Sequence, residues 1–409
     1  MTLTFSRPSP LACARWLIAA IMVGLLFSPP LVNLGELALY ACLAASGELR
    51  RRLLRSARQP MVMATLAFLM VILVGALYSM GSPDEAWSML TGWRKLLFLP
   101  IAVALFDERC WKARLGSILV AVAALCALGS YAGLWLDQGI YLYPPGIIVR
   151  NHATQGMMFS VAAFVALAFL AADRALSRAR RLGLAAATAL LFANVILVTP
   201  GRSGYLVLLV CAVAFVFDLL QRRHAKDWRI YALSALVLAV VAGSLAASTI
   251  VRERIEQGVR EIETYKESKE ITSMGIRMVL WQNTLEMIRE RPLLGSGTGS
   301  FGAAYRQKVA GQSGWRAENL SSDPHNQYLK IAAEHGLVGL AVFLWLIVSA
   351  FRQPSASPYR LLGLGVLLAW CATSLFSSHF STFSEGSFIA LWCGAMLARE
   401  TEDRPGGDG

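Results

Sequence analysis

The chain has 409 residues, of which 56% are hydrophobic and only 16% are charged. A soluble globular protein carries about a quarter charged residues, so this composition excludes that class. The formal net charge of +12 would suit a nucleic-acid partner, but the positions of the charges, described below, argue against one.

Apolar runs of about twenty residues recur along nearly the whole chain and predict an all-α, polytopic membrane protein. The first run lacks a following small-residue cleavage site, so we expect a retained span and not a signal peptide. The second is short and could be re-entrant. The twelve candidate spans are residues 12–29, 31–47, 60–80, 89–106, 115–136, 154–172, 183–199, 203–220, 230–249, 326–350, 360–377 and 385–399.

The loops between these spans alternate in charge. The basic loops are "LRRRLLRSARQ", "DERCWKAR", "DRALSRARR" and "QRRHAKDWR", whereas "GSPDEAWS", "TPGRS" and "SSHFSTFSEG" contain few Lys or Arg residues. Because basic loops stay in the cytoplasm, both termini are predicted to be cytoplasmic. The positive charge is therefore mainly a topology signal and requires no nucleic-acid partner.

One long polar segment, residues 250–325, interrupts the alternation of apolar spans and short loops, on the side opposite the basic loops. It contains two amphipathic patterns, expected to be helices on or near the membrane surface. The predicted organisation is spans one to nine in residues 1–249, this outer loop, spans ten to twelve in residues 326–399, and a cytoplasmic tail at 400–409. The apolar positions of the two patterns are Ile255, Val259 and Ile262, then Trp281, Leu285 and Ile288.

Several kinds of chemistry lack their sequence signatures. The long outer loop contains none of the seven cysteines, and there is no CxxC, no DxD and no nucleotide-binding GKS or GKT. The stretch "GSGTGSFG" has the glycines of a phosphate-binding loop but no lysine, and we interpret it as a turn. We therefore expect neither a metal, nor a nucleotide, nor another cofactor.

The arginines on the outer side are the first candidates for a functional site. Arg202 lies in the tight turn "TPGRSGYL", and Arg277 opens the second amphipathic pattern in "GIRMVLWQNTLE". An arginine that faces the interior of a bundle usually meets an anion. The alternatives are contact with lipid headgroups for Arg202 and a solvated surface charge for Arg277.

Three further cations are weaker candidates. Arg150 lies in "VRNHATQG", where a plain loop role is equally compatible with the sequence. Arg94 and Lys95, in "TGWRKLLF", enter an apolar helix, which is costly unless they are paired or solvated. They too could serve an anion.

His325 lies in "SSDPHNQYLKIAAEHGLVGL", at the outer edge of the tenth span. Asp323 or His325 is expected to cap the helix that Pro324 helps to start. An imidazole titrates near neutral pH and suits a general base; a structural capping role is the alternative. His379, in "SSHFSTF", is expected to be an ordinary loop residue.

These motifs resemble the O-antigen ligase family, whose relatives include O-antigen polymerases and protein O-oligosaccharyltransferases. The resemblance rests on twelve spans, the long outer loop, "PGRSG", "RPLLGSGTGSF" and "DPHNQYLKIAAEHGLVG". It implies an enzyme of the bacterial inner membrane that transfers a glycan from undecaprenyl diphosphate at the periplasmic face. The essential residues would be His325, Arg202 and Arg277, with Arg150, Lys95, Arg94, Asn326 and Trp281 in contact with substrate.

Within this superfamily, the resemblance favours a lipopolysaccharide O-antigen ligase. Its donor would be undecaprenyl-diphosphate-linked O-antigen, and its acceptor a sugar of lipid A–core, with membrane lipids around both. A polymerase of lipid-linked glycans is the first alternative. A polysaccharide transporter or flippase is the second, and would use charges deep within several spans.

Overall fold

The computed structural model describes residues 9–137, 144–173, 175–222, 228–267, 272–311 and 321–401. All regular structure in these ranges is helical, which confirms the all-α class. The helices are α1 (Pro10–Phe27), α2 (Pro29–Ala45), α3 (Gly47–Ser56), α4 (Pro60–Leu77), α5 (Pro83–Trp93), η1 (Arg94–Leu97), α6 (Phe98–Leu105), α7 (Arg109–Trp135), α8 (His152–Ala172), α9 (Arg178–Leu197), α10 (Arg202–Arg222), α11 (Trp228–Ala247), α12 (Thr249–Glu267), α13 (Ser273–Glu290), α14 (Phe301–Val309), α16 (Gln327–Phe351), α17 (Tyr359–Thr373) and α18 (Phe383–Leu397).

Each of the twelve expected spans coincides with a helix or with a run of joined helices. Nine of these, among the described residues, are long and apolar enough to cross a membrane, including the continuous run Pro83–Leu105 formed by α5, η1 and α6. The remaining three, α2, α17 and α18, are shorter apolar helices. The protein is a multi-pass membrane protein.

Helix α8 lies at the centre of the bundle, and α11 lies at its edge. The most apolar window of α8 is 78% buried, against 17% for α11. Close packing of α8 on α10 depends on glycine: a Cβ on Gly204 would lie 2.8 Å from the Cα of Gly156. The Ser160 hydroxyl then donates to the Gly204 carbonyl at 3.0 Å. The start of α10 is thereby fixed against the start of α8.

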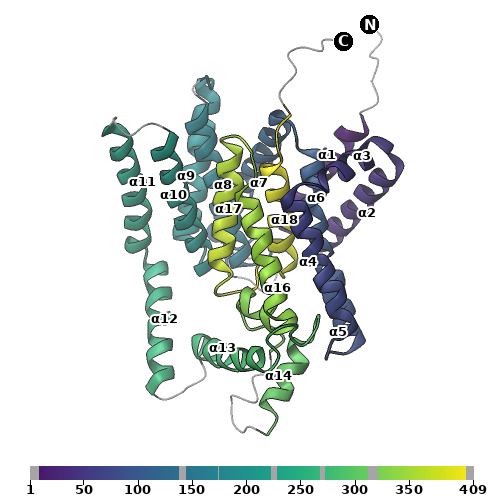
Figure 1. Ribbon diagram of the computed structural model, residues 1–409. Helices are drawn as coiled ribbons and strands as arrows, with labels where there is room; N and C mark the ends of the chain where they lie inside the picture. The colour runs from purple at the N-terminus through teal and green to yellow at the C-terminus, as the bar shows by residue number, and fades with distance from the viewer. Residues whose placement is uncertain are drawn as a thin grey trace.

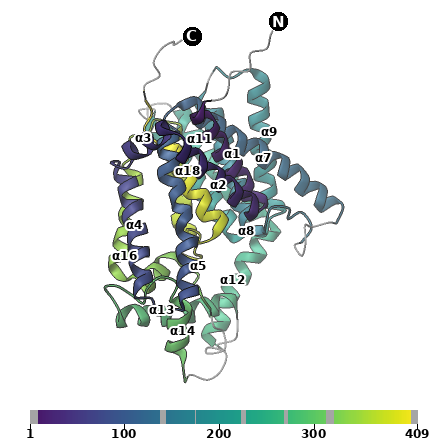
Figure 2. The ribbon, with the colours of Figure 1, turned by 90° about the vertical axis from the view of Figure 1, so that its right-hand side faces the viewer.

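Figure 1 shows α13 and α14 across one end of the bundle, opposite the start of α1 and the end of α18. Helix α12 continues from the end of α11 beyond the end of the bundle, and its expected position on or near the membrane surface stays a prediction. Helices α3 and α14 were not predicted, because each is a short segment inside a polar loop. Figure 2 shows α4 and α16 side by side at one edge.

The tenth span was predicted as one helix, but the structure breaks it at Gly336. This residue has φ +64° and ψ −168° within α16. The glycine-rich turn that follows α13 fills the break: the Leu337 amide donates to the Pro292 carbonyl at 2.7 Å, and the Gly297 amide to the Glu334 carbonyl at 2.7 Å. The turn thus docks the outer loop into the side of α16.

Candidate active site

A cavity of about 750 Å³ lies at the end of the bundle covered by α13. The starts of α8 and α10, the helices α12 and α13, and the segments before α16 and after α17 form its walls. Arg202, Arg277 and His325 all line it. The three residues that the sequence singled out, far apart along the chain, therefore share one cavity.

Glycines place Arg202 at the wall of this cavity. A Cβ on Gly201 would lie 3.0 Å from the His152 carbonyl oxygen, so a larger residue would require the backbone of α8 to shift there. Arg202 is then the first residue of α10. On the other side, α12 covers its guanidinium, because a Cβ on Gly258 would lie 3.5 Å from the Cζ and both Nη atoms of Arg202.

Arg277 lies close enough to Arg202 for their positive charges to repel each other. Burial lowers the pKa of the Arg277 guanidinium, the positive charge of Arg202 lowers it further, and the Glu261 carboxylate partly opposes both. Among the described residues, no carboxylate lies within 4.0 Å of either arginine. Two neighbouring cations without a close counter-ion favour an anionic ligand.

The remaining charges in the cavity do not neutralise this pair. Arg254 also lines the cavity, and Glu261 is the acidic residue in the lining. The Glu261 carboxylate is already engaged: it accepts from the Met274 amide at 3.1 Å and from the Gln257 side chain at 2.9 Å. Its position ties α12 to the start of α13 and leaves the cavity with an excess of positive charge.

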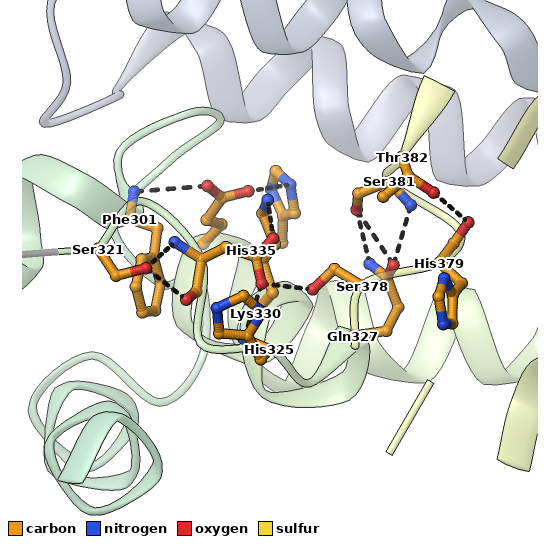
Figure 3. Close-up of polar contacts among 12 residues, drawn as sticks. Phe301, Ser321, His325, Gln327, Lys330, His335, Ser378, His379, Ser381 and Thr382 are labelled. Atoms are coloured by element: carbon orange, nitrogen blue, oxygen red, sulfur yellow. Dashed lines mark hydrogen bonds and ion pairs between the residues drawn. The ribbon is translucent and has the colours of Figure 1, made fainter. Parts of the chain in front are cut away.

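His325 is held in a strained backbone conformation by Asp323. His325 has φ +54°, a region that non-glycine residues rarely adopt and that recurs at functional sites. Its backbone amide donates to Asp323 Oδ1 at 2.7 Å. The same oxygen accepts from the Ser378 hydroxyl at 2.7 Å, and Asp323 Oδ2 accepts from Lys330 Nζ at 2.9 Å. Figure 3 shows these contacts around His325.

Burial lowers the pKa of the His325 imidazole below its ordinary value. The Asp323 carboxylate opposes this shift, whereas the charges of Arg277 and Lys330 add to it. The imidazole is thus mainly neutral at pH 7 and can accept a proton. A neutral imidazole that lines the same cavity as two guanidinium groups has the composition of a base beside an anion site.

The loop between α17 and α18 forms the wall beside His325. Asn326 Nδ2 donates to the Leu375 carbonyl at 3.0 Å, and the Gln327 side chain exchanges bonds with Ser381. Lys95 Nζ donates to the carbonyls of Ser381 and Thr382. These contacts connect the loop to α16 and to η1, and Figure 3 shows the bonds between Gln327 and Ser381.

His379 belongs to the same cavity, which differs from the expectation of an ordinary loop residue. Its side chain is only 5% exposed, and neither ring nitrogen has a hydrogen-bond partner among the described residues. Burial lowers its pKa, and the carboxylates of Glu385 and Asp323 oppose that shift. His152 and Arg254 also line the cavity. No spacing in the sequence distinguishes these residues from ordinary loop positions.

None of the five expected substrate contacts is among the described residues that line the cavity. Trp281 Nε1 donates to the Pro324 carbonyl at 2.9 Å and so supports the His325 segment. Asn326 accepts from the Tyr328 and Leu329 amides and is the cap of α16, a role that was expected of Asp323 or His325.

Lys95, Arg94 and Arg150 have separate surroundings. Lys95 supports the α17–α18 loop, as described above. Arg94 pairs with Glu36 at 3.2 Å and donates to Asn33 at 2.8 Å. Arg150 has φ +44°, and its Nη1 is buried with no hydrogen-bond partner among the described residues.

Comparison with known proteins finds a family match over a stretch that contributes part of the cavity lining. The family described as "O-Antigen ligase" matches residues 187–344. A putative polysaccharide ligase of Rickettsia conorii is 28% identical over 29% of this chain and 29% of its own length. The O-antigen ligase of Salmonella typhimurium is 25% identical over 40% of this chain and 38% of its own length.

An uncharacterized protein of Haemophilus influenzae is 24% identical over 36% of this chain and 37% of its own length. The chain therefore matches less than two thirds of the length of each of these relatives. Arg202, Arg277 and His325 all lie inside the stretch matched by the family. Residues 187–344 thus match the model of the O-antigen ligase family, the family that the sequence motifs resemble.

Proposed function

We propose that this chain is a metal-independent glycosyltransferase that moves O-antigen polysaccharide from undecaprenyl diphosphate to a sugar of lipid A–core. The reaction would occur at the periplasmic face of the bacterial inner membrane. The observation that carries the proposal is the convergence of Arg202, Arg277 and His325 on one cavity with an excess of positive charge. Family membership of the matched stretch supports glycan transfer in general.

The histidine and the two arginines have different roles in the proposed reaction. The acceptor hydroxyl attacks the anomeric carbon of the donor, and its proton passes to the neutral imidazole of His325. The bond between that carbon and the diphosphate oxygen breaks, and the lipid diphosphate leaves with the electron pair. Arg202 and Arg277 stabilise the negative charge that develops on the diphosphate. A single displacement inverts the anomeric configuration.

A polymerase would use the same chemistry with a second lipid-linked glycan as acceptor. The two functions separate in a reconstituted system that contains undecaprenyl-diphosphate glycan and one acceptor at a time. We expect a gel shift of lipid A–core, with and without EDTA. Elongation of the lipid-linked glycan, with no shift of lipid A–core, would instead identify a polymerase.

Buried ionisable groups in α16 raise the alternative of a transporter. Lys330, Glu334 and His335 are each at most 5% exposed. Lys330 pairs with Asp323, and Glu334 accepts from the Phe301 amide at 3.4 Å, so both connect α16 to the outer loop. We therefore assign them to the docking of that loop. Movement of the lipid-linked glycan between leaflets, without transfer, would favour the transporter.

A further inference from the structure

A second cavity, of about 870 Å³, lies at the end of the bundle opposite the candidate active site. Helix α3, the end of α6 and the segment after α18 enclose it. Its charged lining consists of Arg51, Arg52, Arg55 and Arg399 together with Glu48, Asp107 and Glu400. By the charge of the loops, this end faces the cytoplasm.

The acidic residues of this cavity are already paired. Asp107 bonds Arg15 and Arg52, each at 2.8 Å, and Glu48 bonds Arg52 at 3.1 Å. Glu400 pairs with Lys112, a fully buried cation, at 2.7 Å. These ion pairs connect α1, α3, α7 and the segment after α18. They leave the carboxylates already paired with cations.

Three arginines of the lining remain without a counter-ion. Arg51, Arg55 and Arg399 have no carboxylate within 4.0 Å among the residues that the structure describes. Arg51 and Arg55 are four residues apart and therefore on one face of α3. Arg399 comes from the far end of the chain. Guanidinium groups that converge on a concave site match the geometry of a phosphate.

An apolar track begins beside this cavity. Gln59 lines the cavity, and α4 starts at the next residue. Met63, Leu66, Met70 and Leu73 of α4 are between 42% and 57% exposed, at intervals that place them on one face of the helix. Figure 2 shows α4 running from α3 along the edge of the bundle.

We propose that this cavity binds the phosphodiester of an anionic phospholipid, whose acyl chains lie along the exposed face of α4. Basic clusters at the cytoplasmic ends of membrane helices bind such headgroups. A soluble phosphate compound would bind the same arginines but would make no contact with the exposed apolar face of α4. Arginines that only set the orientation of the chain in the membrane would require neither a cavity nor an adjacent apolar helix face. The proposal is independent of the glycosyltransferase assignment.

The test is lipid retention, measured by native mass spectrometry after extraction from vesicles that contain phosphatidylglycerol and phosphatidylcholine. We compare the wild type with Arg51→Gln/Arg55→Gln. The control is Arg178→Gln/Arg180→Gln, which removes the same charge from exposed positions at the start of α9, on the same predicted side. The Arg51→Lys/Arg55→Lys variant keeps the charge but loses the planar fork.

We expect the glutamine variant to lose phosphatidylglycerol at least about tenfold relative to the wild type, the lysine variant to be intermediate, and the control to be unchanged. Equal loss in the control would overturn the proposal, because retention would then depend on overall charge. A second measurement titrates inorganic phosphate into delipidated protein and records thermal stabilisation. Stabilisation that depends on Arg51 and Arg55, without lipid retention, would assign the site to a soluble phosphate compound and overturn the lipid assignment.

Discussion

Lys330 Nζ lies 2.9 Å from Asp323 Oδ2, and the other oxygen of that carboxylate accepts from the backbone amide of His325. The side chains of Lys330 and Asp323 are only 7% and 26% exposed. The pair therefore connects a buried cation of α16 to the conformation of the proposed base. A buried ion pair contributes little net stability, but the loss of one partner is costly.

Lys330→Met is expected to slow transfer by on the order of tenfold while the donor KM changes little. The reason is that Asp323, without its cation, holds the His325 segment less firmly. The variant should also lose stability, by at most about 3–5 kcal/mol. Steady-state kinetics and thermal unfolding in detergent measure both effects. The double variant Lys330→Met/Asp323→Asn removes both charges and should recover stability but not kcat. If stability and kcat recover together, the pair has only a structural role.

His325→Asn is expected to abolish transfer, with a loss of about 10²–10⁴-fold in kcat. Asparagine tolerates positive φ better than alanine does, so this variant removes the base without the added backbone strain of His325→Ala. The cap of α16 belongs to Asn326 and is unaffected. Donor binding and thermal unfolding should therefore be close to wild type.

His379 cannot serve as the control for this experiment, because it lines the same cavity. Substitution of Asn33, which lies outside the cavity and bonds Arg94, is a better control. Transfer at near wild-type rate by a folded His325→Asn variant would make His325 a structural residue, with His379 or Glu385 the next candidates for the base.

Arg202→Ala and Arg277→Ala are expected to lower kcat/KM for the donor by about ten- to a hundredfold, since each removes charge-assisted bonds to the bound and departing diphosphate. Lysine at either position should restore only part of this loss. Donor binding, measured with undecaprenyl diphosphate, reports the effect directly. Arg252→Ala is the matched control, because Arg252 is exposed on α12 and does not line the cavity. An equal effect of Arg252→Ala would indicate general attraction by the positive surface.

The transfer rate should depend on pH through His325. Its pKa is lowered by burial from the ordinary value of 6.5, so the neutral form prevails above a midpoint below 6.5. We expect kcat/KM to rise through that midpoint and to be flat at pH 7. Because the folded protein binds this proton less readily than the unfolded chain does, the free energy of unfolding decreases as the pH falls below the unfolded value of 6.5.

A profile measured on His379→Gln identifies which histidine titrates, since burial also lowers the pKa of His379. If the rise of kcat/KM with pH disappears in His379→Gln but remains in His325→Asn, His379 and not His325 is the base. Asp323, Arg277 and Lys330 face His325 and should keep their charges throughout this range.

Gly336→Ala is expected to destabilise the protein by about 2–5 kcal/mol, from backbone strain and overpacking together. A Cβ at this position would lie 2.1 Å from the Leu293 carbonyl oxygen, and the residue has φ +64°. Gly243→Ala is the control, because a Cβ there meets no atom within 4 Å. Thermal unfolding should distinguish the two. Equal unfolding temperatures would mean that the glycine-rich turn does not dock as described.

The sequence was sufficient for those parts of the protein that depend on local patterns. Hydropathy alone placed the spans, since each must match the bilayer independently. Arg202 and His325 could be selected because charged residues are rare at the outer edge of apolar helices. The break at Gly336 could not be predicted, because its partner Leu293 lies far away along the chain and no periodicity links the two. For the same reason, the burial of His379 in the wall of the cavity became apparent only from the packed structure.

The break at Gly336 has a consequence for the thickness of the surrounding bilayer. It leaves Leu337–Phe351 as the longer unbroken segment of α16, and the neighbouring α17 has 15 residues. Helices of this length span about 22 Å, less than the roughly 30 Å of a typical hydrocarbon core. A bilayer thins locally around such short helices at a modest cost per ångström. Under the proposed function, such thinning would bring the outer headgroups, and with them a lipid diphosphate donor, closer to the cavity.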